Sequence, residues 1–432
     1  MASPNTESSA LPIYTRTLPV DPEQIGTITF TKPNNFLSPW TFTPSTSDSG
    51  ANLLAAADAL QSSLYPVAFP TETVYGLGAN AFSSAAVQGI YTAKQRPSDN
   101  PLIVHISSLD MLRRILDPLG TNAANGTECI PPIYNHLIST FWPGPLSILL
   151  PLPTGSKLAP EVSAGQPTFA ARMPINILAL ALIQLCQLPL AAPSANASTR
   201  PSPTTAQHVT HDLGGRIELI LDGGPCTVGV ESTVVDGLCT PPAILRPGGI
   251  SIDQIRQIPG WQDVTIAYKD TTTSNAPRAP GMKYKHYSPT AAVVLAEPNT
   301  PWSQIWQRIV HDNTCKTVGI LRSRTWPDIS SIQGGVAPSQ CFSGSASATV
   351  YNGDGGHHKL QVFSIALGRA TQEIARGLFA GLRELDLLGV ERIYVEGISE
   401  RGEQGSDDDD NDDGAAAAAV MNRLRKAASE VV

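Results

Sequence analysis

A long stretch without periodicity divides the chain into two parts. Between residues 261 and 289 the apolar residues recur at neither helical nor strand spacing, and the sequence includes TTTSNAPRAPGMKYKHYSP. This proline and glycine content is typical of an interdomain linker. The 432 residues also exceed what one hydrophobic core usually organises. We therefore predict two domains, 51–260 and 291–432, joined by a linker at 261–290.

Composition and charge argue against several classes of protein. Hydrophobic residues make up 41% of the chain and charged residues 15%, which favours a globular α/β protein over a disordered one. The net charge is −8, but several of the acids lie in one run at 407–413, so the rest of the chain is close to neutral. We therefore do not expect general electrostatic binding of nucleic acid. The six cysteines include no C-x-x-C pair, so neither a zinc ribbon nor a redox motif is predicted.

The sequence contains neither a membrane span nor a targeting segment that we can identify. The richest apolar stretch, 177–190, is interrupted by Gln184 and Gln187 and falls short of the roughly 18 apolar residues that a span needs. Residues 1–50, rich in Ser, Thr and Pro, are predicted to be an extension with one strand. They hold no apolar signal core and carry acids where a transit peptide would carry arginines. We expect a cytoplasmic protein, with a mitochondrial pool left open.

Short apolar strands alternate with helices in the first domain. Helices are expected at 52–64, 83–93 and 177–186, and strands at 66–70, 102–106, 146–150, 169–173, 217–221 and 243–245. TETVYGLG and KQRPSDNP are expected to be loops that follow the first strand and the second helix. The pattern predicts a twisted mixed sheet with helices.

The second domain shows a compact β-α pattern. AAVVLAE, TVGILRS and ERIYVEG are expected to be strands, separated by helices of which one is long, 362–388. This arrangement predicts a smaller Rossmann-like α/β domain. The acidic insert at 406–419, SDDDDNDDGAAAAA, is of low complexity and is predicted to be a solvated loop before a last helix at 420–428.

Two segments are candidates for phosphate binding. Lys94 and Arg96 put two cations on one loop, and charge-assisted bonds to phosphate contribute on the order of 1.5 to 3 kcal/mol each. Ser194 and Asn196, in PSANAS after the apolar LPLAA, lie where a strand end could meet a ligand. Taken singly, a solvated helix end and an ordinary helix cap are the commoner explanations of these residues. The sequence has no G-x-x-x-x-G-K-[ST] motif, so phosphate binding would need another arrangement.

Hydroxyls and a buried arginine are candidates for recognising a small polar molecule. Thr71, Thr73 and Tyr75 crowd a loop after a strand, although a threonine-rich turn is equally plausible. His105 ends an apolar strand, where a satisfied core histidine is the commoner explanation. Arg172, inside FAARMP, must find an anionic partner, because an unpaired buried charge costs several kcal/mol. That partner is either a substrate carboxylate or an internal Asp or Glu.

Further polar residues lie near strand ends, and common catalytic motifs are missing. VGVESTVVD and AILRPGGIS place Ser232, Thr233 and Arg246 at strand ends of the same sheet. The sequence holds no Ser-His-Asp order, nucleophile elbow or H-E-x-x-H helix, so hydrolase and metalloprotease chemistry is not predicted.

Taken together, seven motifs resemble the YrdC-like threonylcarbamoyl-AMP synthase family. They are FPTETVYGLG, AKQRPSDNPL, FWPGPLSILL, PSANAS, GVESTVVD, ILRPGG and PGMKYKHYSP, in family order along residues 53–289. LRELDLLGVERIYVEG and VMNRLRKAA are similar to the extra domain of the family's long form. The resemblance implies a YrdC-like sheet in the first domain and an enzyme that condenses L-threonine, bicarbonate and ATP to threonylcarbamoyl-AMP and pyrophosphate, with Mg²⁺ on ATP. It also implies that the product passes to a tRNA threonylcarbamoyl-transferase complex.

The resemblance also implies roles for individual residues. Lys94 and Arg96 would be catalytic. The implied threonine contacts are Thr73, His105, Arg172, Ala192 and Ser232, with Arg172 meeting the carboxylate. The implied ATP contacts are Lys94, Arg96, Asn100, Thr168, Ser194, Asn196, Ser202, Arg246, Tyr284 and Tyr287, and no metal-ligating side chain is implied. The linker is similar to a flap over the site, which would explain the two tyrosines. The acidic insert stands where the family has a short glycine-rich loop.

Two other functions stay open at this point. A non-catalytic RNA-binding module would use KYKHY as a basic segment for weak tRNA contact. A carbamoyl-transfer enzyme of the hydrogenase-maturation type shares the domain, but it carries cysteine pairs and an acylphosphatase segment that this sequence lacks.

Overall fold

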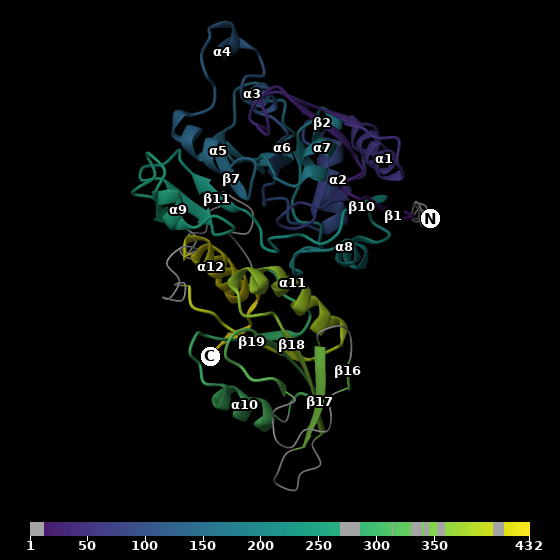
Figure 1. Ribbon diagram of the computed structural model, residues 1–432, viewed down its shortest axis with the longest axis vertical. Helices are drawn as coiled ribbons and strands as arrows, with labels where there is room; N and C mark the ends of the chain where they lie inside the picture. Colours follow the sequence, from purple (N-terminus) through teal and green to yellow (C-terminus); the bar gives the residue numbers. More distant parts are fainter. Residues whose placement is uncertain are drawn as a thin grey trace, which may run out of the picture.

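Two bodies, each built on its own sheet, make up the protein (Figure 1). The computed structural model describes residues 13–267, 286–312, 314–329, 339–340, 345–351, 359–400 and 410–432. Within these ranges the first domain holds an eleven-stranded sheet and the second a seven-stranded one. The predicted α/β fold class is therefore confirmed.

The first sheet mixes parallel and antiparallel neighbours. Its strands in spatial order are β1 (Arg16–Pro19), β10 (Leu219–Asp222), β4 (Val67–Phe69), β5 (Gly76–Asn80), β9 (Leu190–Ala191), β6 (Ile103–His105), β8 (Thr168–Arg172), β7 (Leu146–Pro151), β11 (Thr233–Asp236), β12 (Ala243–Arg246) and β13 (Thr265–Ile266). β6 and β8 run parallel, whereas β7 and β8 run antiparallel. The central strands are almost wholly buried, which explains why they are short apolar runs and not alternating ones.

Nine helices of the described first domain surround this sheet. They are α1 (Asp48–Ser62), α2 (Ser84–Lys94), α3 (Leu109–Leu116), α4 (Thr121–Ala124), α5 (Asn135–Phe141), α6 (Pro160–Ser163), α7 (Ile177–Cys186), α8 (Ala206–Leu213) and α9 (Ile252–Arg256), with a 3-10 turn at Pro132–Tyr134. Ser83 is the N-cap of α2, and its hydroxyl accepts a hydrogen bond from the backbone N–H of Ala86. α2 ends because Gln95 is left-handed, with φ 52°, so Lys94 is the last helical residue and Arg96 lies beyond it.

The N-terminal segment contributes more to the first domain than the sequence suggested. β1 pairs with β10 in the sheet, and β2 (Gly26–Phe30) forms a hairpin with β3 (Trp40–Pro44). Ile25 and Trp40 belong to the core, and the indole N–H of Trp40 donates to the backbone oxygen of Ser107. Residues 16–44, expected to lie mostly in an extension, therefore form part of the domain's packing.

A central parallel sheet organises the second domain. In spatial order its strands are β16 (Ser339–Gln340), β17 (Ser345–Tyr351), β18 (Lys359–Ala366), β15 (Thr317–Arg322), β19 (Arg392–Glu396), β14 (Ala292–Ala296) and β20 (Glu430–Val431), and its helices are α10 (Trp302–His311), α11 (Thr371–Leu387) and α12 (Asp410–Ala427). The strands from β18 to β20 are parallel, whereas β16 and β17 are antiparallel. The three strands predicted here are β14, β15 and β19.

Two predictions in the second domain were wrong. The long helix expected at 362–388 begins only at Thr371, because 362–366 belongs to β18 and is almost entirely buried in the sheet. The acidic insert is not simply a loop, because α12 begins at Asp410 and buries Ala415 and Ala417. Alanine has the highest helix propensity, which favours a helix over this alanine run.

The two domains meet through α11 and α12, which lie against the lower face of the first domain in Figure 1. At one point the backbones almost touch. A Cβ atom on Gly229, whose φ is +83°, would lie 2.4 Å from Cα of Arg376. Residues 268–285 of the predicted linker, with Tyr284, lie outside the described residues. None of the helices described is long and apolar enough to cross a membrane.

Candidate functional site

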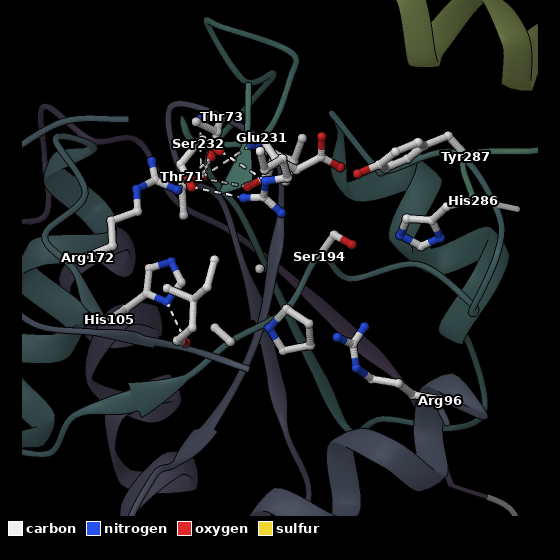
Figure 2. A pocket seen from close by; sticks show the side chains of 16 residues that line it. Thr71, Thr73, Arg96, His105, Arg172, Ser194, Glu231, Ser232, His286 and Tyr287 are labelled. Carbon is white, nitrogen blue, oxygen red and sulfur yellow. Dashed lines mark hydrogen bonds between the residues drawn. The ribbon is translucent and has the colours of Figure 1, made fainter. Parts of the chain in front are cut away.

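One pocket opens where several strands of the first sheet end, and it faces the second domain (Figure 2). Its lining combines hydroxyls, cations and a carboxylate with small apolar side chains. The lining residues are Thr71, Thr73, Val74, Gly76, Arg96, Ile103, His105, Arg172, Ala192, Pro193, Ser194, Glu231, Ser232, Arg246, His286 and Tyr287. In Figure 2, Arg172 and His105 lie on one side, Arg96, His286 and Tyr287 on the other, and Ser194 between them.

Arg172 is fixed by three hydrogen bonds at the end of β8. His105 ends the parallel neighbour β6 and is its register partner, so both side chains reach the same edge of the sheet. The Arg172 guanidinium donates to the Gly144 carbonyl at 3.1 Å and to the Thr73 hydroxyl at 2.9 Å, and it forms an ion pair with Glu72. Both charged side chains are about 5% exposed or less. The internal acid that was one of two expected partners of Arg172 is therefore Glu72.

Ser232 is held by the adjacent strands. Its hydroxyl lies 2.9 Å from that of Ser147 on β7, and Nη2 of Arg246 donates to it at 3.0 Å. Nε of Arg246 donates to the Ser232 carbonyl at 3.1 Å. Arg246 reaches Ser232 because β12 runs antiparallel to β11, so the end of one strand meets the start of the other.

Burial controls the charge of the groups around the pocket. Burial and, to a smaller extent, the positive charge of Arg172 together lower the pKa of His105 to about 3, so the imidazole is neutral at pH 7. Burial also lowers the pKa of Arg96 and of Arg246 to about 10, so both guanidinium groups remain charged at neutral pH. The pocket therefore combines a neutral imidazole with several permanent positive charges.

Lys94 holds a loop instead of lining the pocket. We call residues 193–203 the Ser194 loop. Nζ of Lys94 donates to the backbone carbonyls of Ser194 and Asn196 and lies 3.4 Å from Oδ1 of Asn196. The Ser194 hydroxyl donates to the same Oδ1. Burial lowers the pKa of Lys94 well below its ordinary value, and Arg96 contributes in the same direction. Lys94 thus fixes the backbone that presents Ser194 to the pocket.

The second domain contributes to the pocket through the end of the linker. Tyr287 has a left-handed φ of 64°, is 1% exposed, stacks on Phe379 of α11 and lies beneath the guanidinium of Arg423. Arg423, on α12, is wholly buried and pairs with Glu231 at 2.9 Å. Burial raises the pKa of Glu231, but Arg423 and Arg246 outweigh it and hold that pKa at about 2. Two side chains of the second domain therefore fix Tyr287 and Glu231.

The structure brings together most, but not all, of the predicted site residues. Those in the pocket lining are Thr73, His105, Arg172, Ala192, Ser232, Arg96, Ser194, Arg246 and Tyr287. Those outside the described lining are Lys94, Asn100, Thr168, Asn196 and Ser202.

The five residues outside the lining have other positions. Lys94 lies behind the Ser194 loop and donates to the backbone carbonyl of Asn196, which belongs to that loop. Ser202, also in the loop, donates through its hydroxyl to Glu231. The Asn100 carbonyl accepts from Nε of Arg96. Thr168 begins the strand that Arg172 ends, which separates the two by about 13 Å.

Several residues of the site were not singled out from the sequence. Glu72 and Glu231 stand inside the motifs TETVYGLG and GVESTVVD, so their place beside Thr73 and Ser232 was a usable signal. Arg423 gave no such signal, because its partner Glu231 lies 192 residues away in the chain.

Metal ligands are scarce around the pocket. Among the residues that the structure describes, no group of three or more His, Cys, Asp or Glu side chains is placed to hold a metal ion. Glu231 is the only acid among the described lining residues, and its two oxygens already accept from Ser202 and Arg423.

Comparisons with known proteins agree with this architecture. Residues 63–248 match the family model described as telomere recombination, and residues 250–429 match the model described as threonylcarbamoyl-AMP synthase, C-terminal domain. The threonylcarbamoyl-AMP synthase of Schizosaccharomyces pombe is 46% identical over 405 residues, which cover 89% of this chain and 90% of that protein. That of Bacillus subtilis is 40% identical over 382 residues, covering 87% and 92%.

A solved structure is also similar over both domains. Sua5 of Pyrococcus abyssi complexed with L-threonine has a TM-score of 0.69 and 36% identity, over 88% of this chain and 96% of that one. Together with the sequence relatives, this match confirms the resemblance that the motifs indicated. The chain therefore belongs to the threonylcarbamoyl-AMP synthase family of enzymes.

Proposed function

We propose that this enzyme condenses L-threonine, bicarbonate and ATP to threonylcarbamoyl-AMP and pyrophosphate. One observation carries the proposal: all five residues that the resemblance assigned to threonine line one pocket, together with four of those assigned to ATP. We call Thr73, His105, Arg172, Ala192 and Ser232 the threonine wall. Arg96, Ser194, Arg246 and Tyr287 are the ATP wall.

The chemistry of the threonine wall suits an amino acid with a hydroxyl. Arg172 makes three hydrogen bonds through its side chain, and a guanidinium has five N–H donors, so a substrate carboxylate can add to its existing partners. Glu72 reduces the positive charge of the arginine without removing those donors. The small Ala192 and the hydroxyls of Thr73 and Ser232 leave polar contacts for a short side chain.

The chemistry of the ATP wall suits a triphosphate. Arg96 and Arg246 carry permanent charge, and each can make charge-assisted bonds to phosphate oxygens. Burial and the nearby Glu231 raise the pKa of Tyr287 to about 12, so its hydroxyl stays protonated and can donate. Mg²⁺ would enter on the phosphates of ATP, since Glu231 is already engaged.

The proposed reaction needs no covalent enzyme intermediate. The neutral amine of threonine attacks the carbon of bicarbonate or carbon dioxide, which gives a carbamate, with loss of water in the case of bicarbonate and of a proton to solvent in the case of carbon dioxide. A carbamate oxygen then attacks the α-phosphorus of ATP, and pyrophosphate leaves with the electrons of the broken P–O bond. Arg96 and Arg246 would stabilise the negative charge that develops on the phosphate oxygens. Positioning the reactants would supply much of the remaining acceleration.

The neutral His105 fits this sequence of steps. A charged imidazolium beside Arg172 would repel an ammonium group and would compete for the carboxylate. Because its pKa is about 3, His105 stays uncharged and can offer a ring nitrogen as a hydrogen-bond partner for the threonine amine or hydroxyl.

We further propose that the product supplies a tRNA threonylcarbamoyl-transferase complex. The reactive mixed anhydride that the reaction forms is suited to transfer of its threonylcarbamoyl group to a nucleophilic amine, and tRNA modification is the process named by the resemblance.

A pyrophosphate-release assay tests the proposed reaction. Purified protein receives ATP, Mg²⁺ and bicarbonate, with and without L-threonine, and serine and valine serve as matched controls that each lack one side-chain group of threonine. We expect release to depend on threonine and to weaken with either analogue. Release that is indifferent to threonine would show that the enzyme hydrolyses ATP by another route and would refute the proposal.

A further inference from the structure

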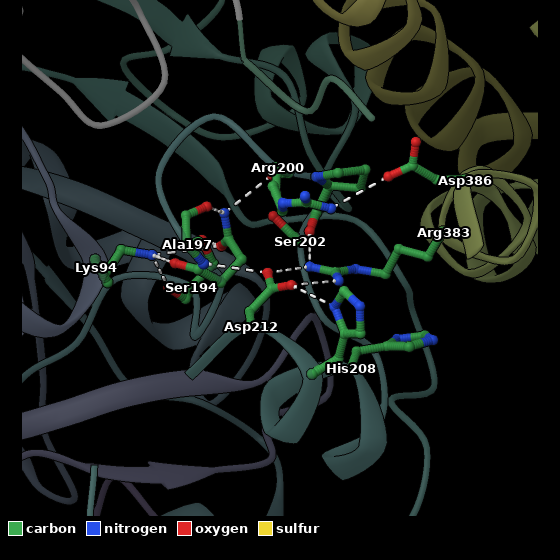
Figure 3. Close-up of polar contacts among 12 residues, drawn as sticks. Lys94, Ser194, Ala197, Arg200, Ser202, His208, Asp212, Arg383 and Asp386 are labelled. Atoms are coloured by element: carbon green, nitrogen blue, oxygen red, sulfur yellow. Dashed lines mark hydrogen bonds and ion pairs between the residues drawn. The ribbon is translucent and has the colours of Figure 1, made fainter. Parts of the chain in front are cut away.

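A buried ion pair between the domains stands directly behind the Ser194 loop (Figure 3). Arg383, on α11 of the second domain, makes two parallel bonds to Asp212, on α8 of the first. Nη1 lies 3.0 Å from Oδ1 and Nη2 lies 2.7 Å from Oδ2. The side chain of Asp212 is 0% exposed and that of Arg383 5% exposed. The pair crosses 171 residues of sequence and joins the two domains at the loop.

Arg383 reaches the Ser194 loop at two points. The backbone N–H of Ala197 donates to Oδ2 of Asp212 at 3.1 Å, so the carboxylate that Arg383 orients also fixes the middle of the loop. Nη2 of Arg383 donates directly to the carbonyl of Pro201, farther along the loop. One guanidinium of the second domain therefore restrains Ala197 and Pro201 together.

The restraint at Ala197 lies next to the atoms that present Ser194. The carbonyl of Asn196 accepts from Nζ of Lys94 at 2.6 Å, and the backbone N–H of Ser198 donates to the Lys94 carbonyl at 2.9 Å. Lys94 and Asp212 thus hold consecutive residues of the loop from opposite sides. A shift of Ala197 would disturb both Lys94 contacts and, through them, the position of Ser194.

The pair depends on both partners. Burial raises the pKa of Asp212, but the hydrogen bonds and charge of Arg383 outweigh it and leave that pKa below its ordinary value. Without Arg383, the buried carboxylate would keep only the donors of Ala197 and His211 and would lose its compensating charge. Either water or a moved side chain would then replace Arg383, and the loop would lose its single conformation.

We propose that Arg383 is a positioning residue for the reaction, acting through Asp212 to hold the Ser194 loop in the conformation that binds ATP. This inference rests on the proposed function only in taking the Ser194 loop as part of the ATP wall. The threonine wall makes no contact with this pair in the described structure, because Arg172 is anchored by Gly144, Thr73 and Glu72 within the first domain. The second domain would therefore control the affinity for nucleotide separately from that for threonine.

Calorimetric titrations test this separation directly. Mg²⁺ with ATP, and separately L-threonine, are titrated into wild type, Arg383→Lys, Arg383→Ala, Asp212→Asn and the double variant Arg383→Ala/Asp212→Asn. Lysine keeps the charge but cannot make two parallel bonds. We expect ATP binding to weaken roughly 10- to 100-fold in Arg383→Ala, the range expected for lost charge-assisted bonds, and less in Arg383→Lys. Threonine binding should stay unchanged, and the double variant should bind ATP no more weakly than Arg383→Ala.

The chain offers a matched control on the same helix. Arg376→Ala removes another arginine of α11 that crosses the interface, whose Nε donates to the Thr227 carbonyl at 3.0 Å, outside the Ser194 loop. We expect this variant to bind ATP as the wild type does. Thermal unfolding of every variant separates a change in the loop from a general loss of structure.

Every outcome of these titrations either supports or overturns the proposed role of Arg383. Unchanged ATP affinity in Arg383→Ala would overturn the inference, as would a parallel loss of ATP and threonine affinity that follows thermal stability. Additive effects of Arg383 and Asp212 would show that the arginine does not act through the carboxylate. If the wild type released no pyrophosphate in response to threonine, the proposed function would fail, and the ATP titrations would still test Arg383.

Discussion

The two walls of the pocket are built in different ways. Arg172 and His105, in the threonine wall, stand at the ends of neighbouring strands of one sheet, and their contacts stay within the first domain. Tyr287 and the Ser194 loop, in the ATP wall, depend on side chains of the second domain, through Arg423 and Arg383. The difference indicates that the first domain alone could shape the threonine wall, whereas the ATP wall needs both domains.

The largest expected effect separates a buried from an exposed arginine on α12. Arg423→Met leaves Glu231 buried without its charge partner and removes the cation above Tyr287, which should lower the free energy of unfolding by about 3 to 5 kcal/mol. Arg425→Met breaks pairs of an arginine side chain that is 40% exposed, and should cost at most about 1 kcal/mol. Urea unfolding of the two variants and the wild type measures the difference.

Equal losses from the two arginine variants would contradict this expectation. They would show that the interface tolerates the loss of the ion pair between Arg423 and Glu231, and the ATP wall would then not depend on α12. A loss of ATP binding in Arg423→Met with normal threonine binding would sharpen the contrast between the walls.

Within the threonine wall, replacing Arg172 should reduce the affinity for threonine most. Arg172→Ala removes the proposed carboxylate partner and should weaken threonine binding roughly 100-fold, with a much smaller effect on ATP. Glu72→Gln is the matched control, because it removes the charge partner of Arg172 and leaves the guanidinium in place. Titration calorimetry with each ligand gives the four affinities. If Glu72→Gln weakened threonine binding as much as Arg172→Ala does, Arg172 would act by maintaining the local structure of the pocket and not by binding the carboxylate of threonine.

Acid should destabilise the threonine wall through His105. Its folded pKa of about 3 lies below the ordinary value, so only the unfolded chain binds this proton as the pH falls through about 6.5. Stability from this group is therefore complete above pH 6.5 and is lost on acidification, by about 2 kcal/mol between pH 6.5 and 5. Urea unfolding across this range should show a shallower loss in His105→Gln than in wild type.

A surface histidine supplies the control for this pH dependence. His311→Gln changes an exposed side chain at the end of α10 and should leave the slope as it is in the wild type. A slope that stays unchanged in His105→Gln as well would mean that other groups account for the acid sensitivity.

The sequence located the pocket residues proposed for the threonine wall better than the supports of the proposed ATP wall, for a physical reason. His105, Arg172 and Ser232 lie at or beside the ends of short apolar strands, and strand ends can be found from local patterns. Arg383 and Arg423 act on partners 171 and 192 residues away, on helices whose docking no local pattern specifies. Sequence motifs therefore located one wall and missed the supports of the other.

The errors in secondary structure have the same origin. The strand KLQVFSIA is apolar enough to continue a helical pattern, and only its place between β15 and β17 makes it a strand. The acidic, low-complexity neighbours of the alanine run before residue 420 favour a loop, but alanine itself favours the helix that the structure shows. Packing against distant segments decided the first case and helix propensity the second.

The smallest expected effect compares two contacts of α11 with the same loop. Arg200, in the Ser194 loop, pairs with Asp386 of α11 at 3.1 Å, but its side chain is 36% exposed. Asp386 also accepts from the backbone N–H groups of Thr290 and Ala291. Arg200→Ala should therefore cost at most about 1 kcal/mol and weaken ATP binding only a few-fold, less than Arg383→Ala does. Equal effects of the two variants in the ATP titration would mean that the loop responds to any loss of contact with α11, and that the buried pair with Asp212 has no special part in holding it.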